Sequence, residues 1–396
     1  MEESGTNLSH VRQVVAIYTN IGRGHPSYLN SLFQTLQDKG QKVICRTVFE
    51  ESDGLSLLAW KLVERLYFIG GKGGLRTKLY NWLRASQRDV SSDSRFLKVL
   101  GRDLREKYQH FKGICLVAHP VVARILASVC RTWYVHGEIA APSECAVKGV
   151  EKVFVPLEKT KERLISFGAD PETVVVTGLM IEPGLVESAE KSFQARLKRI
   201  ESNQPLTIGF FTSGAYPKEH LKKILWGTKS VVEQKMRAII FTGTCPEKFE
   251  WFKKRFKKWG FSVLEDRGEV LGKEEKGDIW LVTRETRQAE TLRTLQLVPH
   301  MDAFVAASHE RTNWAVGLGL PMFVLFPLIG TFASLNFEFA QRQKVAYSID
   351  SLEKAKTLGK IIGELRQNGQ LTRKAENGFG GHKTNGVRQA ASHLPF

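Results

Sequence analysis

Residues 13–32, QVVAIYTNIGRGHPSYLNSL, contain the pattern that decides the fold. Residues 13–18 are a short apolar run, typical of a buried strand, and residues 27–39 carry apolar side chains at helical spacing. Between them lie Gly22, Arg23, Gly24, His25 and Pro26. The glycines permit a tight turn close to a ligand, and Pro26 suits the first turn of a helix. The stretch predicts strand, loop and helix, with His25 at the ligand-binding edge of a parallel sheet; the alternative is a packed turn with a solvated histidine.

Composition and cysteine usage narrow the class of protein. The chain has 396 residues, 42% hydrophobic and 25% charged, which is long enough for two soluble globular domains. No window has the apolar length of a membrane span, and the first ten residues lack a signal-peptide pattern, so we expect a cytoplasmic protein. Five scattered cysteines without CxxC spacing argue against a disulfide framework and a zinc site.

The net charge of +17 predicts anionic partners. Nucleic acid, nucleotide substrates and acidic lipid headgroups all fit such an excess of cations. The sequence contains no RNP, KH, zinc-finger or helix-turn-helix signature. We therefore expect no nucleic-acid partner.

Residues 54–87 mix aromatic, aliphatic and basic side chains on two expected helices around a glycine-rich break at 70–74. This composition is typical of an interfacial helix on an anionic bilayer, and an ordinary buried hairpin is the alternative. The residues expected at such a membrane surface are Trp60, Tyr67, Phe68, Tyr80 and Trp82.

Strands and helices alternate along the chain, which predicts parallel, doubly wound sheets. A second strand, turn and helix begins at residue 206 with LTIGFFTSGAYPKEHLKKIL. We therefore expect two Rossmann-like domains. The predicted division is residues 1–186, a linker at 187–204, residues 205–350, and a C-terminal helix with a basic tail at 351–396.

Residues 153–185, VFVPLEKTKERLISFGADPETVVVTGLMIEPGL, carry a resemblance to a known family. The run resembles the end of the N-terminal domain in glycosyltransferases that make glycolipids: monogalactosyldiacylglycerol synthase, the processive diacylglycerol glucosyltransferases and, more distantly, the lipid II N-acetylglucosaminyltransferase. The matching positions are Pro156, Glu158, Thr160, Lys161, Leu164, Gly168, Pro171, Glu172, Val175, Thr177, Gly178, Ile181 and Pro183.

Three further stretches are similar to motifs of that family. Residues 22–25 resemble its glycine-rich loop ending in His, and His119 with Pro120 resembles its His-Pro pair. Residues 319–321, followed by Asn336, resemble its Gly-Leu-Pro motif and later Asn. The resemblance implies a GT-B fold, in which two Rossmann-like domains face each other across a cleft.

The resemblance implies an inverting, metal-independent glycosyltransferase. It would move a sugar from a nucleotide-sugar donor, expected to be UDP-linked, to a lipid acceptor at the membrane surface, without a cofactor. His25 and His119 are the candidate catalytic residues, with Gly22, Arg23 and Gly24 as the phosphate or acceptor loop. The candidate donor-binding residues are Ser213, Gly214, Ser308, His309, Glu310, Arg311, Asn313, Thr331 and Asn336.

The sequence departs from the family at the donor pocket. Residues 308–311 read Ser-His-Glu-Arg where the family has Gly-Pro-Gly-Thr, and Trp314 replaces a glutamate that binds ribose. Two alternative functions therefore stay open. One is a catalytically inactive GT-B binding or scaffold protein. The other is a GT-B nucleotide-sugar epimerase, which needs several acidic residues near the cleft that the sequence pattern alone does not place there.

Overall fold

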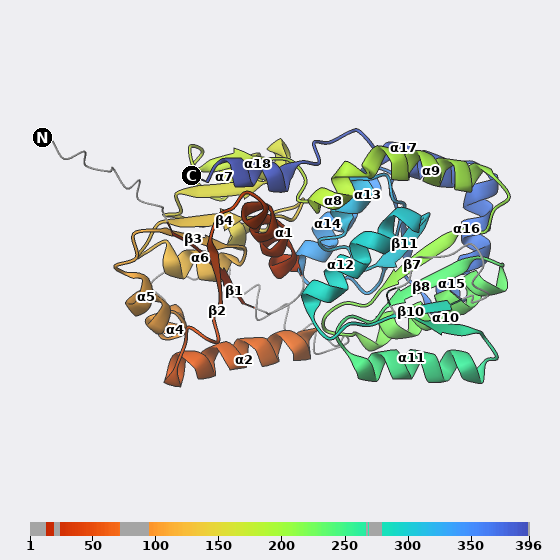
Figure 1. Ribbon diagram of the computed structural model, residues 1–396, viewed down its shortest axis with the longest axis horizontal. Helices are drawn as coiled ribbons and strands as arrows, with labels where there is room; N and C mark the ends of the chain where they lie inside the picture. Colours follow the sequence, from red (N-terminus) through yellow and green to blue (C-terminus); the bar gives the residue numbers. More distant parts are fainter. Residues whose placement is uncertain (1–12, 20–23, 72–94, 267, 269–278, 395–396) are drawn as a thin grey trace, which may run out of the picture.

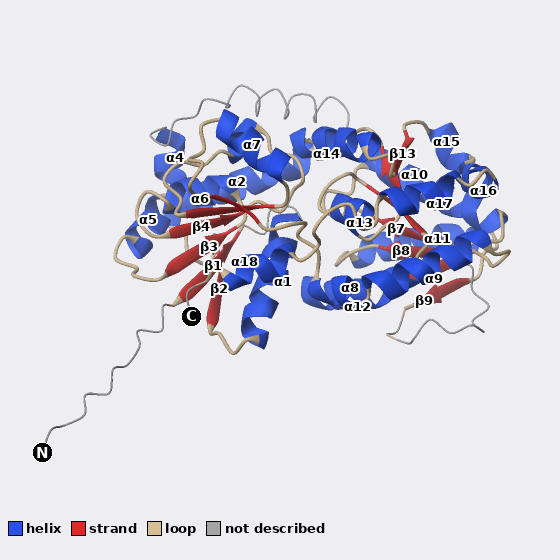
Figure 2. Ribbon diagram, turned by 90° about the horizontal axis from the view of Figure 1, so that it is seen from above, coloured by secondary structure: helices blue, strands red, loops and turns tan. Residues whose placement is uncertain are grey.

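The structure is a computed structural model that describes residues 13–19, 24–71, 95–266, 268 and 279–394. It contains two α/β domains side by side, each built on a wholly parallel sheet (Figures 1 and 2). The expected pair of Rossmann-like domains in a GT-B-like arrangement is confirmed.

The first domain has a six-stranded sheet in the order β2-β1-β3-β4-β5-β6. Its strands are β1 (Val14–Tyr18), β2 (Val43–Thr47), β3 (Ile114–Val117), β4 (Thr132–Val135), β5 (Lys152–Val155) and β6 (Val174–Val176). Its helices are α1 (Gly24–Asp38), α2 (Gly54–Gly70), α4 (Arg95–Leu100), α5 (Arg102–Tyr108), α6 (Pro120–Leu126) and α7 (Glu158–Ser166). The central strands β1, β3 and β4 are buried along their whole length, as expected for strands covered by helices on both faces.

The second domain has a seven-stranded sheet in the order β13-β12-β11-β7-β8-β10-β9. Its strands are β7 (Thr207–Phe211), β8 (Arg237–Phe241), β9 (Val263–Glu265), β10 (Ile279–Val282), β11 (Ala303–Ala306), β12 (Met322–Leu325) and β13 (Ala346–Ile349). Its helices are α10 (Lys218–Glu233), α11 (Pro246–Lys258), α12 (Arg287–Leu297), α13 (Thr312–Gly317) and α14 (Thr331–Arg342). Because every strand is parallel to its neighbours, the loops that follow the strands gather at one edge of this sheet.

The chain crosses between the domains twice. The first crossing contains α8 (Pro183–Glu187) and α9 (Ala189–Glu201), and the chain returns after α15 (Leu352–Lys356), α16 (Leu358–Gln367) and α17 (Gln370–Asn377). The last helix, α18 (Gly386–Ser392), lies against α1 of the first domain (Figure 2). The final segment, expected as one helix and a basic tail, is therefore four helices. These helices bury their apolar faces and carry their charges on the other side. The high Gly content of the segment made this helical periodicity hard to recognise in the sequence.

Arg196 of α9 fixes the first crossing to the second domain. Its side chain is 1% exposed, and its guanidinium donates hydrogen bonds to the carbonyl oxygens of Met301, Leu318 and Gly319 at 2.8–3.1 Å. Phe193, one turn earlier, stacks on Phe379 with ring centroids 4.0 Å apart. The crossing segment is thus part of the packed core of the second domain.

None of the helices that the structure describes combines the length and the apolar character needed to cross a membrane.

Candidate active site

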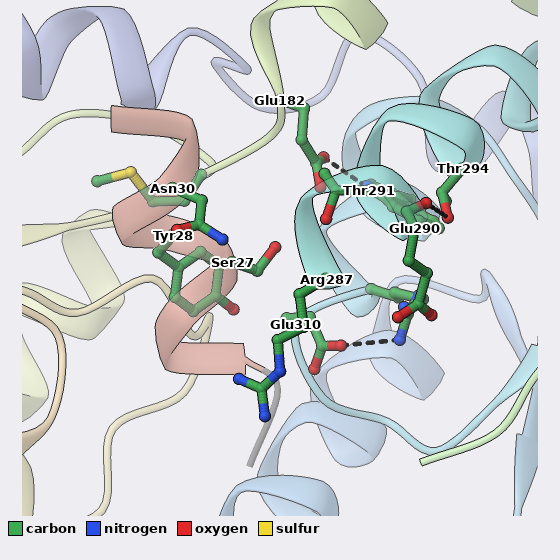
Figure 3. A pocket seen from close by; sticks show the side chains of 12 residues that line it. Ser27, Tyr28, Asn30, Glu182, Arg287, Glu290, Thr291, Thr294 and Glu310 are labelled. Carbon is green, nitrogen blue, oxygen red and sulfur yellow. Dashed lines mark hydrogen bonds and ion pairs between the residues drawn. The ribbon is translucent and has the colours of Figure 1, made fainter. Parts of the chain in front are cut away.

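A cleft lies between α1 of the first domain and α12 of the second (Figure 3). The first domain lines it with Ser27, Tyr28 and Asn30, and the first crossing adds Met180 and Glu182. The second domain lines it with Arg287, Glu290, Thr291, Thr294, Glu310, Arg311 and Trp314. Three carboxylates and two guanidinium groups therefore converge on one cleft, from segments that are far apart in the sequence.

Tyr28 lies three residues after His25 on α1 and lines the cleft. It is on the second turn of α1, its side chain is 3% exposed, and its ring covers the backbone of Gly137. A Cβ atom at position 137 would lie only 2.4 Å from that ring, so only glycine fits there. Burial, together with the nearby carboxylates of Glu138, Glu310 and Glu182, raises the pKa of the Tyr28 hydroxyl well above its usual value of 10.

Glu138 follows β4 in a short loop at the carboxyl edge of the first sheet. Its side chain is 6% exposed, and burial, reinforced by the negative charge of Glu310, raises its pKa to about 8. Asn336 of α14 donates a hydrogen bond of 2.6 Å to its Oε2 atom. A carboxyl group with this pKa can both accept and donate a proton near neutral pH.

The loop that carries Glu138 is held from several sides. His136 lies 3.1 Å from the Tyr134 hydroxyl and 3.3 Å from the carbonyl oxygen of Ala140, so it closes the loop at both ends. Thr160 of α7 donates to the carbonyl oxygen of Ile139. The backbone of the loop that carries Glu138 is therefore held by its own domain, whereas the Glu138 carboxyl is contacted by Asn336 of the second domain.

Glu310 and Arg311 lie in the loop between β11 and α13. Their side chains form an ion pair of 2.8 Å and are 13% and 16% exposed. The Arg311 guanidinium also lies 4.4 Å from the centre of the Phe211 ring, which fixes its orientation over an aromatic face. The pair is thus held at the cleft wall rather than free at the surface.

Arg287 and Glu290 come from the first turn of α12. Thr286 caps this helix by accepting a hydrogen bond of 3.2 Å from the backbone N–H of Ala289. The helix N-terminus and the Arg287 guanidinium both favour negative charge in this part of the cleft. No sequence motif marks either residue, nor Tyr28 or Glu182, so none of the four was predicted.

Asn313, Thr331 and Asn336, which the sequence predicts to bind the donor, form hydrogen bonds that join the two domains. Asn313 donates to the carbonyl oxygen of Gly137 at 3.0 Å, and Thr331 donates to Glu144 at 3.3 Å. Asn336 contacts Glu138, and its Oδ1 atom accepts a hydrogen bond of 3.2 Å from the N–H of Ala140. These side chains therefore hold the first domain in place.

Four other expected donor residues do not line the described cleft. Ser308 is fully buried and donates to the carbonyl oxygen of Ala333 at 2.6 Å, and the carbonyl of His309 accepts from the N–H of Thr312. Ser213 and Gly214 form the turn after β7, where the Ser213 carbonyl accepts from Tyr216. None of these four residues is among those that line the described cleft.

The structure describes the side chain of one of the two expected catalytic histidines. His119 is the N-cap residue of α6, and its Nδ1 atom accepts a hydrogen bond of 3.2 Å from the N–H of Val121. Gly24 and His25 begin α1, but the side chain of His25 lies outside the described residues, as do Gly22 and Arg23. Among the described residues, no group of three His, Cys, Asp or Glu side chains is arranged to hold a metal ion.

The described residues among those expected at a membrane surface do not share one exposed face. Trp60 is fully buried in the core of the first domain, and Tyr67 is partly buried against it. Phe68 is 39% exposed, and Tyr80 and Trp82 lie outside the described residues. The helical spacing places Trp60 on the inner face of α2, where it packs as a core residue.

No protein-family model and no curated protein sequence matches the chain. Solved structures resemble its fold over nearly its whole length. One is a putative UDP-N-acetylglucosamine 2-epimerase from Listeria monocytogenes, with 13% identity, a TM-score of 0.55, and 95% of this chain and 94% of that chain covered. Another is UDP-GlcNAc 2-epimerase from Neisseria meningitidis bound to UDP-GlcNAc, with 11% identity, a TM-score of 0.52, and 96% and 97% covered. A third is the complex of S. aureus MnaA with UDP, with 12% identity, a TM-score of 0.53, and 95% and 92% covered.

These neighbours correct the family expectation. They include UDP-N-acetylglucosamine 2-epimerases rather than the glycolipid-forming glycosyltransferases that residues 153–185 resemble, so that assignment is wrong. The same finding contradicts three further expectations: the glycosyltransferase activity, the role in glycolipid biosynthesis and the membrane association. The reason is structural: residues 153–185 form β5, α7, β6 and the first crossing, so their pattern reports the shared fold and not the reaction.

Proposed function

We propose that this protein is a nucleotide-sugar epimerase that binds a UDP-sugar in the cleft between its two domains. The proposal corresponds to the epimerase alternative left open by the sequence. Two of the similar structures hold UDP or UDP-GlcNAc, which makes UDP-N-acetylglucosamine the first substrate to test.

The observation that carries the proposal is the convergence of Glu182, Glu290, Glu310, Arg287 and Arg311 on one inter-domain cleft. A diphosphate needs cationic partners, which the two guanidinium groups supply. Epimerisation at C2 without a redox step removes the C2 proton while the C1–O bond to the diphosphate breaks, so that the electron pair of the C–H bond forms a C1–C2 double bond. The diphosphate then adds back to C1 as a proton returns to the opposite face of C2, and both proton transfers need groups that accept and donate protons. The acidic residues that an epimerase requires are therefore present, although they are scattered along the chain.

Glu138 adds a proton-transfer group next to this cleft. Its neighbours Tyr28 and Glu310 both line the cleft, and its pKa of about 8 leaves it partly protonated at neutral pH. In the proposal Glu138 exchanges a proton with the sugar or with Glu310, while Arg287 and Arg311 hold the diphosphate. The reaction needs no net oxidation, and in our proposal no cofactor takes part.

The test is incubation of the purified protein with UDP-N-acetylglucosamine, followed by ¹H NMR of the anomeric region. We expect a second anomeric signal from the 2-epimer, and the same final ratio when the reaction starts from that epimer. Glu310→Gln should slow the approach to this ratio by about 10²-fold or more, whereas Glu201→Gln, at the exposed end of α9, should leave the rate unchanged. Tight binding of UDP without any turnover would contradict the enzyme and favour a binding protein.

A further inference from the structure

Glu182 is an acidic residue of the cleft that comes from the segment joining the two domains. It directly precedes α8 in the first crossing between the domains, and its side chain points into the cleft toward Thr291 of α12 (Figure 3). The indole Nε1 of Trp314 donates a hydrogen bond of 2.9 Å to its Oε2 atom. A residue of the second domain therefore orients a carboxylate of the crossing segment.

Trp314 is itself fixed by packing. Its side chain is 4% exposed, and its ring meets Phe211 and Phe304 edge to face, with centroids 5.7 and 6.1 Å apart. Such packing leaves the indole N–H one direction in which to donate. The Glu182 carboxylate is thus held in a single orientation before any ligand arrives.

Glu182 and Arg287 lie far apart within the cleft. Glu182 lies at one end of the view, and Arg287 and Glu310 lie toward the other (Figure 3). A phosphate would be repelled by Glu182 and attracted by Arg287 and Arg311. A carboxylate held next to a nucleotide suits hydroxyl groups instead, because it accepts from two donors at once, as acidic residues do with ribose in other Rossmann-type sites.

We propose that Glu182, oriented by Trp314, binds a pair of adjacent hydroxyl groups of the nucleotide sugar. This inference rests on the proposed function. The hydroxyl pair belongs either to the ribose or to the hexose, since both carry vicinal hydroxyl groups. Glu182 is in this account a binding residue that selects the ligand, and Trp314 is a positioning residue that acts through it.

Calorimetric titration of the full chain with UDP, 2′-deoxy-UDP and UDP-N-acetylglucosamine tests the proposal. If the ribose is bound, wild type should prefer UDP over 2′-deoxy-UDP by about tenfold or more, and Glu182→Ala should abolish that preference. If the hexose is bound, Glu182→Ala should weaken UDP-N-acetylglucosamine by about tenfold and leave UDP unchanged. Trp314→Phe, which keeps the ring and removes the N–H, should show the same pattern to a smaller extent.

The controls separate this inference from the proposed function. Glu182→Gln preserves the size of the side chain and keeps the test valid if Glu182→Ala folds poorly, and Glu201→Ala is the matched change outside the cleft. If wild type binds the nucleotides, and Glu182→Ala and Glu182→Gln each bind every one of the three as tightly as wild type does, the inference is overturned while the proposed function stands. If wild type binds none of the three nucleotides, both the proposed function and this inference are contradicted.

Discussion

Asn336 of the second domain donates a 2.6 Å hydrogen bond to Glu138 of the first domain, and both side chains are buried. The same amide accepts from the N–H of Ala140, so one residue holds the loop after β4 at two points. Glu138 lies in the loop after β4 and Asn336 lies on α14, and the fold brings them together although 198 positions separate them. The contact couples the position of the acidic group to the relative placement of the domains.

Asn336→Ala should destabilise the protein and slow epimerisation. The substitution leaves the buried N–H of Ala140 and the Glu138 carboxyl without this partner, at a cost of about 1–3 kcal/mol in the free energy of unfolding. Urea denaturation measures the loss, with Asn203→Ala, at an exposed position before β7, as the control. Equal stability of the two variants would show that the contact contributes nothing.

The raised pKa of Glu138 predicts how stability depends on pH. The folded state keeps the carboxyl proton up to about pH 8, whereas the unfolded chain loses it near pH 4.5, so unfolding releases a proton between these values. The contribution of Glu138 to stability is therefore full below about pH 4.5 and is lost as pH rises toward 8, with a slope of at most about 1.4 kcal/mol per pH unit.

Glu138→Gln removes this titration. The difference in unfolding free energy between wild type and Glu138→Gln, measured at pH 5, 6.5 and 8, should shift in favour of the variant as pH rises. A difference that is constant over this range would mean that the pKa of Glu138 is not raised.

Gly137→Ala should disturb the cleft directly. The added methyl group would lie 2.4 Å from the Tyr28 ring, and forcing it in should cost about 1–3 kcal/mol and displace Tyr28. Gly184→Ala is the matched control, because a Cβ atom there meets nothing within 4 Å. In a Tyr28→Ala background the cost of Gly137→Ala should shrink, and a cost independent of Tyr28 would place the strain elsewhere.

Arg196→Met should lower the stability of the protein more than a substitution at the surface does. The substitution removes the donor for three buried carbonyl groups, so we expect a loss of about 3 kcal/mol or more by thermal denaturation. Lys191→Met, at an exposed position of the same helix, should stay within about 0.5 kcal/mol of wild type.

The fold could be read from the sequence because it depends on local patterns. The apolar run of residues 13–18 and its counterpart after residue 206 each became the strand that opens a Rossmann-like domain. The family could not be read in the same way. Residues 153–185 form the last strands and helix of the first domain and the start of the segment that joins the domains. A sequence pattern with this structural role can be shared by proteins that have one fold but catalyse different reactions.

The site was predictable only where it followed a strand. Glu310 and Arg311 lie directly beyond β11, and the sequence analysis named both as ligand-binding candidates at the cleft they now line. Glu182 and Arg287 come from a crossing segment and from a helix N-terminus, and only tertiary structure brings them to the same cleft. Asn313 and Asn336 were placed near the ligand, but their partners are backbone and carboxyl groups of the opposite domain, which one sequence cannot reveal.

The most direct test of the central claim is solvent exchange at the inverted carbon. The protein is incubated with UDP-N-acetylglucosamine in D₂O, and deuterium in the recovered sugar nucleotide is measured by mass spectrometry and ¹H NMR. Because the proton that returns passes through Glu138 or a neighbouring carboxyl group, the account predicts one deuterium at the 2-position of the epimerised sugar. A sugar nucleotide recovered unchanged and without deuterium, from protein shown to bind it, would contradict the account.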